Sequence, residues 1–373
     1  MQYRPFGKDG WQISALGYGA MRLPRAKTGG LDHERGVAVL RRAVDQGVNY
    51  IDTAPGYSGG QSEIVVGKAL KDGYRERVRI ATKYGVDSGT REEARATLEG
   101  SLKSMDVDYI DYYHLWGTNY DEFCKTIRPN GALDEVLRAK EEGLIKHLSF
   151  SFHGLGESMI QLCETGLFDS VLCQYNLLDR ETEKALMRAH ELGMGTACMG
   201  PVGGGTLGTP SDKIAGLLPR ERASTAAVAL RFVLSHPGVS CALSGMQTEQ
   251  MVDENVATCS LETPLSPAER EAIMQAMDEN ARLAELYCPG CNYCQPCPMG
   301  VAIPKVFAAV NHQRIYGLEQ VAREMYAGLN GEGDRGANYT ACTDCGLCET
   351  KCPQKIAIRE QLRAAHELLS KGV

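Results

Sequence analysis

The sequence predicts an α/β fold, a (β/α)8 barrel, followed by a small domain rich in cysteine. Two observations predict the barrel: short β-type runs alternate with helical stretches from residue 12 to about residue 260, and about 250 residues are typical of eight such units. A third observation predicts the second domain, because eight of the 14 cysteines fall within residues 288–352. We therefore expect a barrel over residues 1–265, then a linker helix and a cysteine-rich domain over residues 266–373. An open, doubly wound sheet is the alternative for the first part.

Eight short runs of apolar and β-branched residues are the strand candidates of the barrel. They are Ala15–Gly19, Asn49–Asp52, Ile80–Lys83, Tyr109–Leu115, Ile145–Ser151, Ser170–Gln174, Gly195–Met199 and Val239–Ser244. Between them apolar residues recur at helical spacing, as Leu133, Val136 and Ala139 do within residues 132–142. Strands that alternate with helices pair in parallel, so the carboxyl ends of all eight should meet at one rim.

A glycine-rich segment, residues 203–208, formally matches the G-x-G-x-x-G pattern of a dinucleotide-binding turn. Such a turn normally stands early in a domain and is followed about 20 residues later by an acidic residue that closes a strand. Here the segment follows the seventh strand candidate and runs into Pro210. We interpret it as a barrel loop in which glycine lets the backbone approach a diphosphate.

The chain beyond the barrel is predicted to be mostly helical. Ser266 and Glu269 form a capping box with Pro267 at the first helical position, which predicts a helix from there to about residue 284. Residues 304–328 have a helical pattern, and the glycine-rich residues 330–336 predict a flexible loop.

Charge and hydropathy narrow the class of protein. The net charge of −7 argues against a nucleic-acid partner, because phosphate binding needs a basic face. No apolar run approaches the roughly 20 residues of a membrane span, and residues 1–7 lack the apolar core of a secretory signal. We expect a cytoplasmic protein. The six cysteines outside the C-terminal group are expected to be small buried hydrophobes; they are Cys124, Cys163, Cys173, Cys198, Cys241 and Cys259.

The eight remaining cysteines form two runs, each ending in a Cys-Pro step. The first run is Cys288, Cys291, Cys294 and Cys297, and the second is Cys342, Cys345, Cys348 and Cys352. Two-residue spacing lets three thiolates hold one [4Fe–4S] cluster, while the cysteine before the proline ligates the other cluster. We therefore assign Cys352 to the cluster of the first run and Cys297 to that of the second.

Two zinc sites are the alternative for these cysteines, since zinc is also held by Cys-x2-Cys pairs. Zinc ligands normally come as two pairs separated by a longer loop. Four cysteines within ten residues, followed by proline, favour iron–sulfur clusters.

Four residues with acid–base chemistry stand near the carboxyl ends of consecutive strand candidates. Asp52 ends the second strand, Lys83 ends the third and His114 lies near the end of the fourth, and neighbours in this series are 31 positions apart. Tyr57 lies five residues after Asp52. This spacing of about one βα unit predicts that the side chains share the rim where (β/α)8 enzymes carry out chemistry.

This group suits proton transfer to a carbonyl oxygen. A phenol alone is a weak acid, with a pKa of about 10, and a lysine cation beside it stabilises the phenolate. Aspartate keeps the lysine charged, and a neutral histidine can donate a hydrogen bond to the carbonyl. Taken singly, each residue has an ordinary role as a helix cap, a packed ring, a surface cation or a core histidine. Their common rim position favours catalysis.

At this point the chain resembles the aldo-keto reductase family, specifically its members with a fused ferredoxin-type tail. The resemblance covers residues 3–4, 16–24, 52–54, 60–63, 174–176 and 254–255 and continues into the cysteine tail. It implies a catalytic tetrad of Asp52, Tyr57, Lys83 and His114. It also implies NAD(P)-dependent reduction of a carbonyl, or oxidation of the alcohol, with the nicotinamide cofactor extended across the barrel mouth.

The resemblance places cofactor contacts at Ser151, Gln174, Gly245 and Asn255. Phe152 stands where the family usually has asparagine, and Leu172 stands where it has the glutamine that binds the carboxamide. The loop at residues 245–251, where NADP-binding members carry a base, has none. A monoester phosphate without a cation is poorly held, so NAD is slightly favoured over NADP.

Two functions of different class follow. In the first, the protein is an oxidoreductase of a small carbonyl or alcohol, and the clusters exchange electrons with a redox protein such as ferredoxin. In the second, it is an electron-transfer protein whose barrel binds nicotinamide weakly or not at all. Hydride carries two electrons and a cluster one, so direct coupling needs a flavin-like splitter, and the sequence has no dedicated flavin motif. Tyr18, Met21 and Trp116 are expected to line the barrel mouth.

Overall fold

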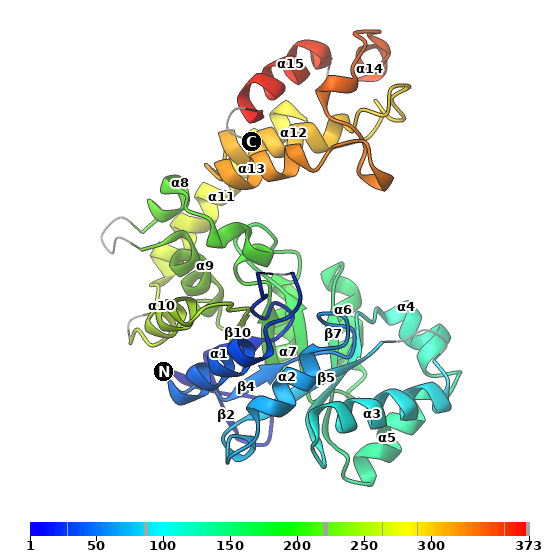
Figure 1. Cartoon of the computed structure of the whole chain (residues 1–373), viewed down its shortest axis with the longest axis vertical. Helices are drawn as coiled ribbons and strands as arrows, with labels where there is room; N and C mark the ends of the chain where they lie inside the picture. Colours follow the sequence, from blue (N-terminus) through cyan, green and yellow to red (C-terminus); the bar gives the residue numbers. More distant parts are fainter. Residues whose placement is uncertain are drawn as a thin grey trace. The chain divides into compact units, whose positions relative to one another are not determined.

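The first 266 residues contain a closed barrel of eight parallel strands, surrounded by helices (Figure 1). The structure, a computed structural model, describes residues 1–27, 29–85, 89–218, 223–262, 264–288, 290–353 and 355–370. The barrel order is β10-β3-β4-β5-β6-β7-β8-β9. Closure between β10 and β3 excludes the open sheet and confirms the predicted (β/α)8 barrel.

The eight barrel strands lie close to the eight predicted runs, and no boundary differs from its prediction by more than two residues. They are β3 (Leu16–Gly19), β4 (Tyr50–Asp52), β5 (Arg79–Gly85), β6 (Ile110–Trp116), β7 (Ile145–Phe152), β8 (Ser170–Gln174), β9 (Gly195–Met199) and β10 (Cys241–Ser244).

At least one helix follows each barrel strand along the chain. These helices are α1 (His33–Asp45), α2 (Ser62–Ala69), α3 (Arg91–Met105), α4 (Tyr120–Glu122), α5 (Ala132–Glu141), α6 (Gly156–Glu164), α7 (Glu183–Glu191), α8 (Asp212–Ala215), α9 (Thr225–Leu234) and α10 (Glu249–Cys259). Side-chain caps mark several starts: Asp32 accepts from the Arg35 N–H before α1, and Thr90 accepts from the Glu93 N–H before α3.

An antiparallel hairpin that the sequence pattern did not predict precedes the barrel. Its strands are β1 (Tyr3–Pro5) and β2 (Gln12–Ser14). Phe6 between them is buried against Tyr112, at 5.3 Å between ring centroids, and against Gly195 at the start of β9. The hairpin therefore closes the amino-terminal end of the barrel, which leaves the opposite rim for a site.

Gly67 of α2 lies where the helix crosses the end of α3. A Cβ at this position would stand 2.4 Å from the carbonyl oxygen of Met105, which is backbone and cannot rotate away. We expect Gly67→Ala to lower the free energy of unfolding by about 1–3 kcal/mol, because the added methyl group overpacks the contact between the two helices. Urea denaturation measures the change.

Gly100 of α3 is the matched control for that substitution. It is exposed and helical, and a Cβ there meets no atom within 4 Å. Gly100→Ala should stabilise the chain by about 0.4–1 kcal/mol through the unfolded state. Equal effects of the two substitutions would contradict this packing.

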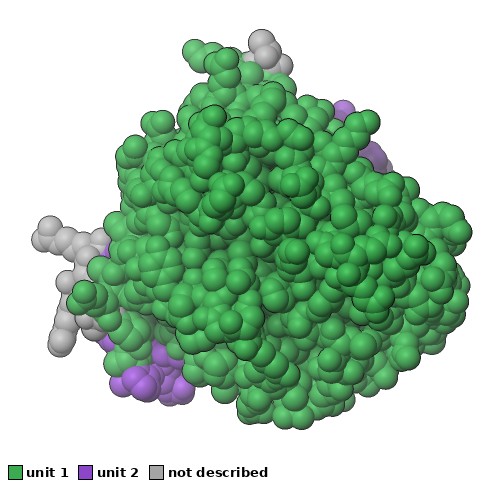
Figure 2. All heavy atoms as spheres, turned by 90° about the horizontal axis from the view of Figure 1, so that it is seen from below, with its two compact units in different colours: residues 1–204, 229–266 green, residues 205–228, 267–373 purple. Residues whose placement is uncertain are grey.

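The chain divides into two compact units, residues 1–204 with 229–266, and residues 205–228 with 267–373 (Figure 2). Residues 205–228, which leave the barrel after β9, thus cluster with the C-terminal part. Within this second unit the Ser211 hydroxyl donates to the Tyr316 carbonyl at 2.6 Å, and Lys213 donates to the Arg314 carbonyl.

The second unit is helical, with α11 (Pro267–Tyr287), α12 (Ile303–Arg314), α13 (Glu319–Ala327), α14 (Leu347–Lys351) and α15 (Ile358–Leu369). The predicted helix from Pro267 is present. The helical character predicted for residues 304–328 is confirmed, and the stretch forms two helices because the chain turns between α12 and α13 at Gly317, whose φ is +66°. Residues 333–335 of the predicted loop form a short 3-10 turn.

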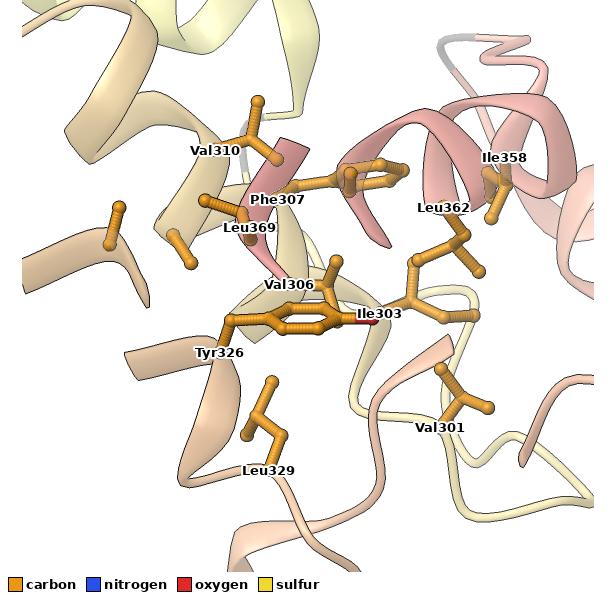
Figure 3. Packing of buried hydrophobic residues seen from close by; sticks show 13 residues of the cluster. Val301, Ile303, Val306, Phe307, Val310, Tyr326, Leu329, Ile358, Leu362 and Leu369 are labelled. Atoms are coloured by element: carbon orange, nitrogen blue, oxygen red, sulfur yellow. The ribbon is translucent and has the colours of Figure 1, made fainter. Parts of the chain in front are cut away.

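A separate hydrophobic core holds the second unit together. Figure 3 shows side chains of α12, α13 and α15 directed toward one another, among them Phe307, Tyr326 and Leu362. Six cysteines pack against this core, namely Cys288, Cys294, Cys297, Cys342, Cys348 and Cys352. Among the described helices, none is both long and apolar enough to cross a membrane.

Of the six cysteines expected to be buried in the barrel, five are buried. Cys124 is the exception and is partly exposed. It lies in the π-helical turn 123–127 after α4, in which Phe123 and Ile127 are the buried side chains.

Candidate functional site

Lys83 and Asp52 form a buried ion pair at the carboxyl-terminal rim of the barrel. Their side chains are 1% and 3% exposed, and the lysine also donates to the Thr53 carbonyl at 2.7 Å. Lys83 lies directly beside His114 in the sheet, whereas Asp52 lies beside Ala81, two residues lower. The long lysine side chain spans that difference, so the three residues meet although their backbones are not all at one level.

The pair shifts the pKa values of both partners. Burial alone would raise the pKa of Asp52, but Lys83 and His114 outweigh burial and lower it below the ordinary value. Burial lowers the pKa of Lys83, and the Asp52 carboxylate opposes that shift. Because water does not reach this pair, Lys83 and Asp52 each have the other as their main charged neighbour, and this attraction holds both side chains in one geometry.

His114 is buried beneath the rim. Its Nε2 lies 3.5 Å from the Asp52 carboxylate and 3.4 Å from the Tyr50 hydroxyl. Burial lowers the pKa of the ring, so His114 is neutral at pH 7. In this geometry the histidine contacts Asp52, whereas the sequence suggested a hydrogen bond to the carbonyl of a substrate.

Tyr57 lies in the loop after β4, where a cavity of about 790 Å³ opens at the rim. Of the four described residues of the predicted tetrad, Tyr57 is the one that lines this cavity. The ring meets Trp116 edge-on at 5.6 Å, and Lys83 Nζ lies 4.9 Å from the ring centroid. The cavity wall also includes Met21, Arg22, Arg25, Ser58 and Gln247.

The surroundings of Tyr57 raise the pKa of its phenol, whereas the sequence led us to expect that Lys83 would stabilise the phenolate. Burial raises the pKa of the phenol, and the Asp52 carboxylate adds to the increase. Lys83 faces the ring and directs its hydrogen bonds to Asp52 and Thr53. Tyr57 therefore holds its proton at neutral pH, which is the state of a general acid.

Two of the three residues expected at the barrel mouth are there. Met21 is 57% exposed and lines the cavity, and Trp116 packs against Tyr57. The expectation for Tyr18 is wrong: it is fully buried and donates to the Met246 carbonyl at 2.5 Å. It stands in β3 between Gly17 and Gly19, which face Cys241 and Leu243 inside the barrel, so alternation along the strand turns Tyr18 to the opposite, helix-covered face.

The four residues predicted to contact a cofactor lie around the rim but already have protein partners. Ser151 Oγ accepts from the Gly117 N–H at 2.9 Å, and Gln174 donates to Asp179 at 3.1 Å. Asn255 donates to Ser244 at 3.2 Å. Gly245 follows β10 and lies against Arg22, a rim cation that the sequence analysis did not single out.

The eight C-terminal cysteines line two cavities of the second unit. One cavity, of about 420 Å³, is lined by Cys297, Cys342, Cys345 and Cys348. The other, of about 330 Å³, is lined by Cys288, Cys291, Cys294 and Cys352. Cys294 and Ile303 border both cavities. Cys297, which precedes Pro298, thus lies with the cysteines of the second run, and Cys352, which precedes Pro353, lies with those of the first run.

The cysteines form the walls of these cavities. Among the described residues, no three His, Cys, Asp or Glu side chains converge as ligands of one metal ion. Four thiols gathered in one wall are the ligand set that a [4Fe–4S] cluster uses.

Comparison with known families and proteins agrees with this architecture. Residues 15–278 match the aldo/keto reductase family, and residues 287–357 match the family described as a 4Fe-4S dicluster domain. A probable aldo-keto reductase 1 from Glycine max is 27% identical over 311 residues, covering 73% of this chain and 87% of that protein. Aldo-keto reductase YhdN from Bacillus subtilis is 30% identical over 197 residues, covering 50% and 57%.

Solved structures share the barrel. Aldo-keto reductase AKR11C1 from Bacillus halodurans, in its holo form, is 26% identical with a TM-score of 0.63, covering 74% of this chain and 96% of that one. An aldo-keto reductase from Klebsiella pneumoniae, solved in complex with NADPH, has the same fold at 23% identity and a TM-score of 0.63, covering 74% and 94%. From its barrel, its tail and these matches, the chain belongs to the aldo/keto reductase family and carries a C-terminal 4Fe-4S dicluster domain.

Proposed function

We propose that the barrel catalyses reduction of a small carbonyl compound, or oxidation of the alcohol, with a nicotinamide cofactor and with Tyr57 as the general acid or base. The observation that supports this most is the position of Tyr57, which lines the rim cavity directly beside the buried Lys83–Asp52 pair. A bound carbonyl compound would meet a phenol that still carries its proton.

Each of the four residues has a distinct part in this proposal. Tyr57 gives its proton to the carbonyl oxygen. Lys83 provides positive charge beside the ring as negative charge develops on the phenolate. Asp52 orients Lys83, and His114 contacts Asp52 and holds it in place.

The rim fits a nicotinamide dinucleotide. The turns after β9 and β10 carry Gly204 and Gly245, where a Cβ would press on Arg22 at 3.3–3.4 Å, so glycine keeps the surface open. When bound, the nicotinamide supplies or accepts hydride. We place its contacts at Ser151, Gln174, Gly245 and Asn255, and favour NAD slightly over NADP because residues 245–251 carry no base.

The pH dependence tests the state of Tyr57. Because burial raises its pKa above the ordinary value of about 10, the phenol stays protonated throughout neutral pH. Reduction of p-nitrobenzaldehyde should therefore give a flat kcat/KM from about pH 6 to 9 and fall only in the alkaline range. A fall near pH 7 would identify a different acid.

For the second unit we propose two [4Fe–4S] clusters, one held by Cys288, Cys291, Cys294 and Cys352 and the other by Cys342, Cys345, Cys348 and Cys297. The two cavities support this division. The clusters would carry single electrons to or from a redox protein such as a ferredoxin.

Double substitutions test this crossed ligation. Cys288→Ser and Cys352→Ser should each remove one cluster, so that iron falls from about eight atoms to about four per chain. Combining them should remove no more iron, because both hold the same cluster. Combining Cys352→Ser with Cys345→Ser should remove both clusters. A double Cys288/Cys352 variant with almost no iron would contradict the assignment.

An electron-transfer protein with weak nicotinamide binding is the second candidate. It is favoured by the rim contacts already made by Ser151 and Gln174, and by the apolar Phe152 and Leu172. Anaerobic turnover separates the two functions. NADH or NADPH alone should support carbonyl reduction if the first holds, whereas dithionite-reduced clusters alone should support it if the second holds.

A further inference from the structure

We propose that Arg22 binds the diphosphate of the nicotinamide dinucleotide. This inference rests on the proposed function. Arg22 belongs to the loop that leaves β3, at the same rim as Tyr57 and on the wall of the same cavity.

The backbone around Arg22 is fixed. The Ala20 N–H donates to the Asp52 carbonyl at 2.8 Å, which ties the loop to β4. Leu23 on the other side is 1% exposed. The arginine thus projects from a segment anchored two residues before it and one residue after it, while its side chain is exposed.

The side chain runs between two glycine turns. A Cβ on Gly245, after β10, would stand 3.4 Å from the Arg22 Cβ, and a Cβ on Gly204, after β9, would stand 3.3 Å from Arg22 Nη2. Gly203 and Gly204 have φ values of +57° and +65°, a region that favours glycine. The guanidinium therefore lies over a bare stretch of backbone.

This arrangement suits an anion that must pass close to backbone. Guanidinium binds phosphate oxygens through two parallel hydrogen bonds, and turns without side chains let a diphosphate approach. Arg22 shares its cavity with Tyr57, so a ligand held here can still reach the acid. The diphosphate is common to NAD and NADP, which distinguishes this contact from one to the 2′-phosphate.

Arg25 provides a matched control in the same cavity. It carries the same charge, but its guanidinium turns back to the Gly29 carbonyl at 3.2 Å within its own loop. Loss of Arg25 therefore removes the same charge from the cavity without removing the cation that lies between the two glycine turns.

The test is anaerobic titration of the full, cluster-loaded chain with NADH and with NADPH, followed by nicotinamide fluorescence. Arg22→Gln should raise Kd for both by the same factor, about tenfold to a hundredfold. Arg22→Lys should recover part of the affinity, and Arg25→Gln should stay within about twofold. Unchanged far-UV circular dichroism and iron content would show that the variants are folded.

Three results would overturn the inference. They are an unchanged Kd in Arg22→Gln, a loss confined to NADPH, which would assign Arg22 to the 2′-phosphate, and an equal loss in Arg25→Gln, which would reflect charge alone. Failure of the proposed function is distinguishable, because the wild-type chain would then bind neither dinucleotide.

Discussion

Replacing Tyr57 by phenylalanine should lower kcat for carbonyl reduction by about 10²–10⁴-fold, the usual contribution of a positioned general acid. The substitution removes one oxygen from the cavity wall and leaves the ring to pack against Trp116. The Lys83–Asp52 pair does not depend on that oxygen, since the lysine donates to Asp52 and Thr53. Steady-state rates with p-nitrobenzaldehyde and NADH measure the effect.

Tyr74→Phe is the control for this loss. The Tyr74 hydroxyl bonds to Asp45, and the residue precedes β5 at the opposite end of the barrel. Its removal should leave kcat unchanged. Full turnover by Tyr57→Phe would remove Tyr57 as the acid, whereas loss of dinucleotide binding in that variant would point to a binding role.

Asp52→Asn should lower the free energy of unfolding by about 3–5 kcal/mol, because it leaves Lys83 buried without its counter-ion. Both side chains are nearly free of solvent contact, so water cannot replace the lost carboxylate. Urea denaturation followed by circular dichroism measures the change, with iron content held equal in the two proteins.

The exposed pair between Arg41 and Asp72 is the matched control. Its members are 26% and 76% exposed, so Asp72→Asn should cost at most about 1 kcal/mol. The Asp52 effect should also depend on pH. Because Lys83 lowers the folded-state pKa, Asp52 contributes fully above its ordinary pKa of about 4, and that contribution is lost as the pH falls through the lower folded value. Equal costs for both variants would contradict the buried pair.

Most of the barrel was predictable from sequence because parallel strands of a closed barrel are buried on both sides. Each is a short apolar run bounded by polar turns, as in Ser170–Gln174 and Gly195–Met199, whose bounds match the prediction. The hairpin of Tyr3–Pro5 and Gln12–Ser14 was missed because three-residue strands are too short to show alternation.

Long-range packing accounts for what the pattern did not reveal. Ser211 and Lys213 stand between two barrel strands in the sequence, yet they donate hydrogen bonds to the carbonyls of Tyr316 and Arg314, about a hundred residues away. Local periodicity carries no information on such a partner. Tyr18 was expected at the mouth because it is next to the strand end, but alternation with Gly17 and Gly19 directs its side chain away from the barrel interior.

The sequence indicated which residues lie together at the candidate site, but not which of them contact one another. Equal spacing brought Asp52, Lys83 and His114 to one rim, but the facing of Lys83 toward the Tyr57 ring depends on rotamers that no sequence pattern encodes. Arg22 had a usable signal, since it stands three residues after the first strand ends. The crossed cysteine groups followed from the Cys-Pro steps alone.

The most direct test of hydride transfer at this rim is the fate of deuterium from NADH or NADPH that carries deuterium at both C4 positions of the nicotinamide, in a single anaerobic turnover with p-nitrobenzaldehyde. We predict that the deuterium is transferred to the carbinol carbon of the alcohol by the wild-type chain and that Tyr57→Phe forms little labelled product. Alcohol without deuterium, or equal alcohol from dithionite-reduced protein without nicotinamide, would contradict hydride transfer at this rim.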